Sequence, residues 1–234
     1  MYFCIMKEIL TPDTVLSDMI DINYGLLQVV SRIGLDLKYS GLKISEACVR
    51  CGIDPETFLL VCKVYSSDEY VPTKADIASG NISDIIRYLR GSHLYYTGAV
   101  LAYLESSFDK LIAPCEERRR GVIRKFCTDY REELVKHFAY EEEVVFPYIE
   151  SLLDGKPAGE YSITQFEEHH GNVEEKLEDM KNIVMKYLPA ECDNSGKIAV
   201  LLSIYHLQDD LRRHTYVEND ILVPMVMKLE KDGR

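Results

Sequence analysis

The sequence predicts an all-α protein: an up-down four-helix bundle that follows a small helical N-terminal domain. Three observations support this prediction. Apolar residues recur three and four positions apart along four segments of the chain, which is the spacing of a core-facing helical stripe. Prolines and glycines separate these segments. A motif of His, three residues and Glu occurs in two of them, followed each time by branched apolar residues and a proline.

The composition limits the class of protein. Hydrophobic residues make up 47% of the 234 residues, which suffices for one large domain or for a medium domain with a small appendage. The formal net charge of −12 argues against binding to nucleic acid or to an anionic membrane surface. No apolar stretch approaches the roughly 20 residues of a membrane span, and no signal peptide is evident. The seven scattered cysteines indicate reduced thiols, so we expect a cytoplasmic protein.

The N-terminal part, residues 1–75, is predicted to form short helices. Gly25 breaks the first of them, Gly52 ends the second, and Pro55 suits the first turn of the third. The segments are helices over 11–29, 44–51 and 54–64, with a loop over 33–41.

Two motifs in this part invite a functional interpretation. A helix, a glycine turn and a second helix outline a DNA-reading helix-turn-helix, but residues 56–62 supply no base-reading Arg, Gln or Asn. Cys48 and Cys51 have the spacing of a redox or zinc half-site, although no second pair accompanies them. We therefore expect neither DNA binding nor a zinc site here, and we interpret the two thiols as structural.

Residues 66–81 are polar and mark the predicted boundary with the bundle, residues 80–234. Four long helices are expected from Ser83 onward, with breaks near Pro114, at 154–161 and at 189–196. The predicted stripes are Ile86, Leu89, His93, Tyr96, Val100 and Tyr103; Ile123, Cys127, Tyr130, Leu134, His137, Glu141, Val144 and Tyr148; Phe166, His170, Val173, Leu177, Met180, Val184 and Tyr187; and Val200, Ile204, Leu207, Leu211, His214, Glu218, Ile221 and Met225.

The polar members of these stripes indicate a metal site. An ionised Glu in a core costs several kcal/mol unless it is paired or bound to a metal, and a metal would satisfy carboxylates and imidazoles together. A wrong register, with these groups facing solvent, is the alternative. His170 fits its stripe and His169 does not, while His206 lies beside the fourth stripe and is interpreted as structural.

The ligand types favour iron, manganese or zinc. The predicted metal ligands are His93, His137, Glu141, His170, His214 and Glu218. Six ligands are too many for one tetrahedral zinc but suit two metals that share carboxylates. With Glu141 and Glu218 as bridges and a solvent-derived oxo or hydroxo bridge, each metal keeps one open position for a small molecule.

At these residues the sequence resembles the hemerythrin-like (HHE cation-binding) family, and within it the di-iron proteins that repair iron–sulfur clusters after nitric oxide or peroxide stress. The resemblance covers about residues 83–229. It rests on Ser92–His93, His137-xxx-Glu141 with Val144–Pro147, Glu168–His170, and Asp209–Leu211 with His214-xxx-Glu218 and Pro224. It implies two non-haem irons held by four His and two Glu, at the six positions named above. Oxygen carriers of the family use one more His, for which only His206 is available here.

The N-terminal part also resembles the small helical domain that precedes the bundle in these repair proteins. That domain carries a Cys-Cys pair where this sequence has Lys38–Tyr39, which puts any thiol chemistry of that loop in doubt.

We expect from this resemblance that the protein repairs damaged iron–sulfur clusters, by iron donation or by chemistry on nitric oxide or peroxide. Its partners would be a small diatomic molecule or peroxide and a client iron–sulfur protein, with no nucleic acid or membrane partner. Catalytic residues and enzymatic status are not assigned, and a homodimer is left open. The alternatives are a sensor of oxygen, nitric oxide or iron that signals to a protein partner, and a metal-free interaction module.

Overall fold

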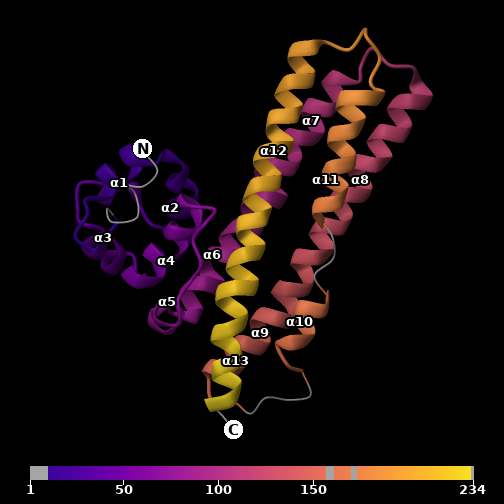
Figure 1. The fold of residues 1–234 in the computed structure, drawn as a ribbon. Coiled ribbons are helices and arrows are strands. Elements are labelled where there is room, and N and C mark those ends of the chain that lie inside the picture. Colours follow the sequence, from indigo (N-terminus) through magenta and orange to yellow (C-terminus); the bar gives the residue numbers. More distant parts are fainter. Residues whose placement is uncertain (1–9, 157–160, 170–172, 233–234) are drawn as a thin grey trace. The chain divides into compact units, whose positions relative to one another are not determined.

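The structure is a computed structural model, and it describes residues 10–156, 161–169 and 173–232. Every regular element in these ranges is a helix, apart from one isolated bridge pair between Val15 and Lys43 (Figure 1). The all-α prediction is therefore confirmed. No helix in the described ranges is both long and apolar enough to cross a membrane.

Short helices form the first part of the chain, and local sequence explains their ends. Gly34, with a φ of 81°, ends the second helix, and Gly52, with a φ of 65°, follows the third. The Asp54 carboxylate accepts a hydrogen bond from the Thr57 N–H at 2.8 Å and caps the fourth, as is usual for a helix N-terminus. The helices are α1 (Leu16–Ile22), α2 (Leu27–Ile33), α3 (Ile44–Arg50) and α4 (Pro55–Ser66), with 3-10 turns at Tyr24–Leu26 and Leu37–Tyr39.

The polar segment 66–81 contains a helix that the sequence interpretation missed, α5 (Lys74–Ser79). The Thr73 hydroxyl accepts a hydrogen bond from the Asp76 N–H at 3.1 Å, and the Asp76 carboxylate accepts one from the Thr73 N–H at 3.0 Å. This capping box supports a helix without any buried apolar residue. A search for apolar periodicity could not detect it.

Four long helical segments form the second part, and each contains a π-helical turn. The prediction of four helices from Ser83 onward is confirmed, with breaks near Pro114 and at 189–196. The segments are α6 (Ile82–Tyr95), η4 (Tyr96–Val100) and α7 (Leu101–Leu111); α8 (Glu117–Tyr140), η5 (Glu141–Val145) and α9 (Phe146–Leu153); α10 (Thr164–His169), α11 (Val173–Asn182) and η6 (Ile183–Tyr187); and α12 (Asn194–Val217), η7 (Glu218–Leu222) and α13 (Val223–Asp232).

The chain divides into two compact units, which we describe separately. Unit 1 comprises residues 1–92, 146–167 and 213–234, and unit 2 comprises residues 93–145 and 168–212. Helices α6, α10 and α12 therefore contribute to both units. The predicted domains, 1–75 and 80–234, were placed by the polar segment in the sequence and not by compactness. The boundary between them stays a prediction.

In unit 1, helices α1–α5 gather around an apolar core, and α6 packs against α2 (Figure 1). The close approach requires Gly91, because a Cβ atom there would lie 2.1 Å from the Arg32 carbonyl oxygen. Arg32 is itself buried, and its guanidinium donates to the Tyr65 hydroxyl at 2.9 Å, which also accepts from the Tyr88 hydroxyl at 2.6 Å. A buried arginine is tolerated only when its donors are satisfied in this way.

A buried carboxylate also ties the last helix of unit 1 to the segment around α9 and α10. Glu230 of α13 accepts hydrogen bonds from the Tyr148 hydroxyl at 2.6 Å and from the Ile163 N–H at 2.8 Å. These bonds offset the cost of removing Glu230 from water.

In unit 2, helices α7, α8, α11 and the first part of α12 lie side by side around a second core (Figure 1). Arg131 on α8 pairs with Glu105 on α7 at 2.7 Å, and Lys181 on α11 donates to Gln208 on α12 at 2.8 Å. The hydrophobic stripes of all four helices meet in this core, and its most deeply buried members are Tyr96, Ile112, Tyr130, Leu134, Leu177, Met180, Val184 and Ile204.

The π turns shift the predicted stripes by one residue in two of the four segments. A π turn holds one residue more than an α turn, so the residue that faces the core after it is displaced by one position. Tyr103 and Val144 are accordingly exposed, and Tyr187, the last residue of η6, is exposed at the end of its helix. The prediction of these three residues as core residues was wrong. After η4 and η5 the buried positions are Leu101, Leu104, Val145 and Ile149 instead.

Candidate metal centre

Unit 2 brings together three of the predicted ligands, His93, His137 and Glu141. The Nε2 atom of His93 lies 2.9 Å from one oxygen of Glu141, and the Nε2 atom of His137 lies 2.9 Å from the other. His93 is near the end of α6, and Glu141 follows α8, which carries His137. The Glu141 side chain is fully buried, and that of His93 is 5% exposed.

Unit 1 holds the second copy of the motif. The Nε2 atom of His214 on α12 lies 3.0 Å from an oxygen of Glu218, and the two side chains are 1% and 0% exposed. The spacing of four residues places both side chains on one face of the helix, as the sequence predicts.

The two motifs share a local backbone feature. Glu141 is the first residue of η5 and Glu218 is the first residue of η7. Single π turns occur frequently at functional sites because they change the direction of side chains within a helix. Both His–Glu pairs thus stand at the point where an α-helix widens into a π turn.

The contacts in these pairs match metal coordination better than hydrogen bonding. Neither oxygen of Glu141 has a hydrogen-bond partner among the described residues, although two imidazole nitrogens lie 2.9 Å away. Two ligands at adjacent corners of an octahedron lie about 3.0 Å apart when their bonds to the metal are about 2.1 Å long. A cation bound at that spacing would also compensate the buried carboxylate, whose desolvation otherwise costs several kcal/mol. The residues present therefore fit a metal ion.

A second carboxylate and an aromatic ring fix the orientation of His93. Its Nδ1 atom lies 2.8 Å from an oxygen of Glu142, which is partly exposed. Its ring stacks on Phe138 with centroids 4.3 Å apart and an interplanar angle of 19°, and Tyr96 also stacks on Phe138, at 5.7 Å between centroids. Sequence reasoning missed Glu142 and Phe138. The run of three glutamates from Glu141 offered the only signal for the first of them.

The remaining predicted residues have different outcomes. His170 lies outside the described residues, as does the side chain of His169 at the end of α10. His206 is exposed on α12, so it is no core ligand. Four of the predicted ligands are buried residues of metal-binding type in the described part of the chain: His93, Glu141, His214 and Glu218. His137 contacts Glu141 and is 15% exposed.

An all-α bundle with buried His-xxx-Glu pairs defines a class of protein, the histidine–carboxylate metal-binding bundles. Comparison of the sequence with protein families agrees with this class. The family model of the hemerythrin HHE cation-binding domain matches residues 84–226, which is more than half of the chain. The protein belongs to the hemerythrin HHE cation-binding family, and membership implies iron binding.

Curated relatives carry the name iron-sulfur cluster repair protein YtfE. The protein from Enterobacter sp. (strain 638) is 31% identical over 45% of this chain and 47% of its own length. That from Cronobacter sakazakii is 31% identical over 47% and 48%, and that from Escherichia coli O81 is 30% identical over 45% and 47%. The chain spans about half the length of the curated relatives that it matches.

Proposed function

We propose that this protein is a non-haem di-iron protein that repairs iron–sulfur clusters damaged by nitric oxide or oxidative stress. The observation that carries the proposal is the pair of buried His–Glu contacts at coordination spacing, each at the start of a π turn. The name of the relatives supports the client chemistry.

In this proposal the His and Glu side chains of the predicted ligand set hold one two-iron centre. The proposed ligands are His93, His137, His170 and His214, with Glu141 and Glu218 as bridges. When bound, the irons supply an electrophilic site for a diatomic molecule or peroxide and a store of iron for a damaged cluster. The chain's own residues fix this centre: Glu142 orients His93, and the stack of Tyr96 and Phe138 shields it from water.

Metal analysis tests the iron centre. Protein produced with excess iron is expected to contain two irons per chain and to show near-ultraviolet bands of an oxo-bridged pair. Glu141→Ala removes a bridging ligand and should lower the iron content to one or none, whereas Glu143→Ala, an exposed neighbour, should leave it unchanged. Unchanged iron content in Glu141→Ala contradicts the ligand assignment.

A reconstitution assay tests the repair role. Iron-loaded protein should restore activity to an iron–sulfur enzyme inactivated by nitric oxide, and the Glu141→Ala variant should not. An iron-loaded protein that restores nothing would be assigned to the second candidate, a sensor that signals to a protein partner.

The sensor candidate is favoured by exposed apolar residues on helices α1–α5 and their loops. Tyr24 is 83% exposed, Val49 69% and Val71 73%, and exposed apolar residues mark a partner surface where they form a contiguous patch. The repair proteins that this sequence resembles carry a Cys-Cys pair in the loop that corresponds to Lys38–Tyr39. Here that loop is a 3-10 turn, in which Lys38 pairs with Asp36 at 2.7 Å. Thiol chemistry in that loop is therefore no part of either proposal.

A further inference from the structure

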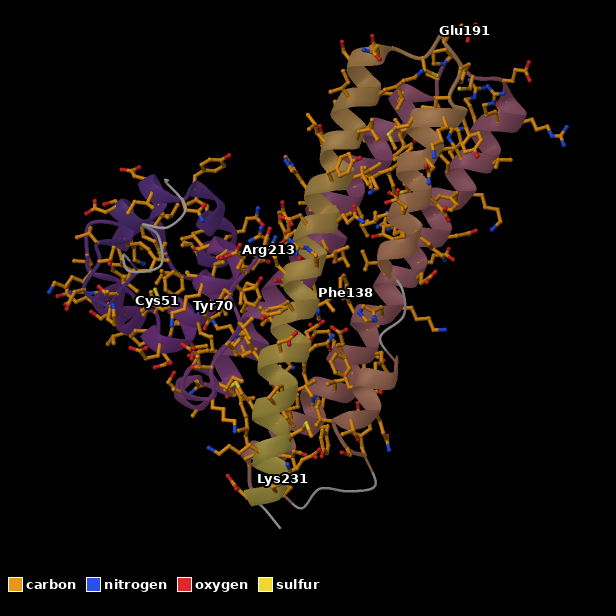
Figure 2. All side chains as sticks on the ribbon, viewed as in Figure 1. Cys51, Tyr70, Phe138, Glu191, Arg213 and Lys231 are labelled. Atoms are coloured by element: carbon orange, nitrogen blue, oxygen red, sulfur yellow. The ribbon has the colours of Figure 1, made fainter. Side chains whose placement is uncertain are left out.

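Two buried thiols meet in unit 2, at residues that the metal centre does not use. Cys115 lies in the turn after α7, and Cys192 lies in the turn before α12. Their Sγ atoms are 3.5 Å apart although 77 positions separate them in the chain. Cys115 is 5% exposed and Cys192 is 2% exposed. Figure 2 labels Glu191, the residue before Cys192, at the end of unit 2 where these turns gather.

Backbone hydrogen bonds hold both thiols in place. The Cys115 N–H donates to the Ile112 carbonyl at 2.9 Å, and the Cys192 N–H donates to the Pro189 carbonyl at 3.2 Å. The Lys197 ammonium donates to the same Pro189 carbonyl at 2.9 Å and so joins the second turn to α12. The two sulfur atoms therefore face one another from turns that are each fixed by local bonds.

The other described cysteines lack this arrangement. Among the residues that the structure describes, Cys115 and Cys192 are the cysteines whose sulfur atoms are in contact. Burial raises the pKa of the Cys48 thiol and of the Cys127 thiol to about 12. Burial also raises the pKa of the Cys192 thiol, so the contact between sulfur atoms, and not the pKa, distinguishes the pair. The Cys48–Cys51 spacing noted in the sequence thus has no counterpart in a thiol contact.

We propose that Cys115 and Cys192 form a reversible dithiol–disulfide pair that is oxidised by low-molecular-weight disulfides. A disulfide needs the sulfur atoms about 2.05 Å apart, so an approach of roughly 1.5 Å, within the range of a side-chain rotation, closes the bond. Reversible disulfides of this kind serve redox sensing in reducing compartments.

The exchange balances in two steps. The thiolate of one cysteine attacks a sulfur of the small disulfide, whose S–S bond breaks, and one small thiol leaves with a proton. The second cysteine, as its thiolate, then attacks the protein sulfur of the mixed disulfide, and the second small thiolate leaves and takes up the proton that this cysteine released. Two protein thiols are oxidised and one small disulfide is reduced to two thiols. The product joins the turn after α7 covalently to the turn before α12.

Redox titration of the full-length protein tests the proposal. The protein is equilibrated anaerobically with mixtures of oxidised and reduced glutathione, quenched with acid and alkylated, and its intact mass and peptide map are measured. Oxidising mixtures are expected to remove two alkylatable thiols and to yield a Cys115–Cys192 cross-linked peptide. Cys115→Ser and Cys192→Ser should each abolish this loss, while the double variant Cys48→Ser with Cys51→Ser should retain it. Oxidation should also raise the Tm of the wild-type protein by about 4 to 16 °C, and that of neither single variant.

Three results would overturn the proposal: a protein whose thiols stay fully alkylatable in every mixture, a disulfide that maps to other cysteines, or an unchanged titration in a folded Cys115→Ser variant. Peptide mapping of the wild-type protein decides the question even where a serine variant fails to fold. None of these measurements depends on bound iron, so they test the thiol pair separately from the repair function.

Discussion

Glu141 and Glu142 are neighbours in the chain, yet the structure gives their carboxylates different environments. Glu141 is fully buried between the Nε2 atoms of two histidines, while Glu142 is partly exposed and reaches the opposite nitrogen of His93. A widened π turn lets two successive side chains serve one imidazole from both sides. A carboxylate behind a ligating histidine fixes its tautomer and raises its basicity.

Glu142→Gln tests this positioning role. The amide keeps the size of the side chain but loses the charge, so we expect iron affinity to fall about tenfold, the lower end of effects for residues behind a ligand. Affinity is measured by competition with a chelator of known strength, and far-UV circular dichroism confirms the fold. Glu143→Gln is the matched control, since that side chain is exposed. Equal affinities in the two variants would show that Glu142 does not position His93.

At the scale of elements, the π turns η4 and η5 change which residues of the same helical segment pack in the core. Without η4, the alternating spacing of the preceding stripe would place Tyr103 in the core, but this side chain is 59% exposed and Leu104 is 3% exposed. The apolar pattern before each π turn identified the core face correctly. The same pattern does not show where a π turn inserts its additional residue.

The pair Tyr103→Ala and Leu104→Ala tests the shifted register. Leu104→Ala leaves a cavity in the core of unit 2 and should lower the free energy of unfolding by about 2 to 5 kcal/mol. Tyr103→Ala removes a side chain that faces mainly solvent and should change it by about 0.5 kcal/mol or less. Chemical denaturation measures both. A larger loss of unfolding free energy in Tyr103→Ala than in Leu104→Ala would contradict the shifted register.

Helix α5 depends on its capping box, and this dependence varies with pH. Burial tends to raise the pKa of Asp76, but hydrogen bonds from Lys63 and Thr73 outweigh it and hold the pKa well below its usual value. A lowered folded-state pKa contributes stability above the unfolded value of about 3.9, and that stability is lost as pH falls further. Asp76→Asn should therefore cost about 1 kcal/mol at pH 7.

The stability difference between wild type and Asp76→Asn is expected to shrink below about pH 4, where the unfolded carboxylate becomes protonated. Urea denaturation at pH 7 and at pH 3 measures it. Asp129→Asn, which removes an exposed partner of Lys125 on α8, should have a much smaller effect at both values. A pH-independent cost for Asp76→Asn would mean that the carboxylate charge is irrelevant to the cap.

For the whole molecule, we expect the buried His–Glu pairs, as the proposed metal ligands, to couple metal binding to folding. Glu141 and Glu218 are both fully buried, and a ligand that binds only the folded state stabilises it by about 2.7 kcal/mol at 100 times its Kd. Removing the metal with a chelator should therefore lower the Tm by about 5 to 10 °C. Differential scanning calorimetry measures the shift, and the Glu141→Ala variant should no longer respond to the chelator. A chelator-insensitive Tm in metal-loaded wild type would rule out this coupling.

Much of the fold could be predicted from the sequence because its signals are local. The stripes before each π turn, the cap at Asp54 and the break at Gly52 depend on neighbouring residues only. Helix α5 was not predicted, because hydrogen bonds rather than buried apolar residues support it. The His-xxx-Glu pairs were predictable from helical spacing, whereas Glu142 was not, since its role depends on a widened turn and on a histidine 49 residues away. The thiol pair was equally hidden, because its members meet only through the packing of two turns.

The π turns also determine where the gene can lose a single codon without disrupting a helix. Each α residue rotates the helix by about 100°, so the loss of one codon within α8 turns every later side chain away from the core. In η5 the same loss converts the π turn into an α turn and leaves Val145 and Ile149 in phase with the stripe before them. Codon-by-codon deletion across residues 117–153, read out by soluble expression, should therefore find one tolerated stretch, at 142–145. The motif that holds the proposed metal ligands would then also be the place where this helix can lose a residue and still fold.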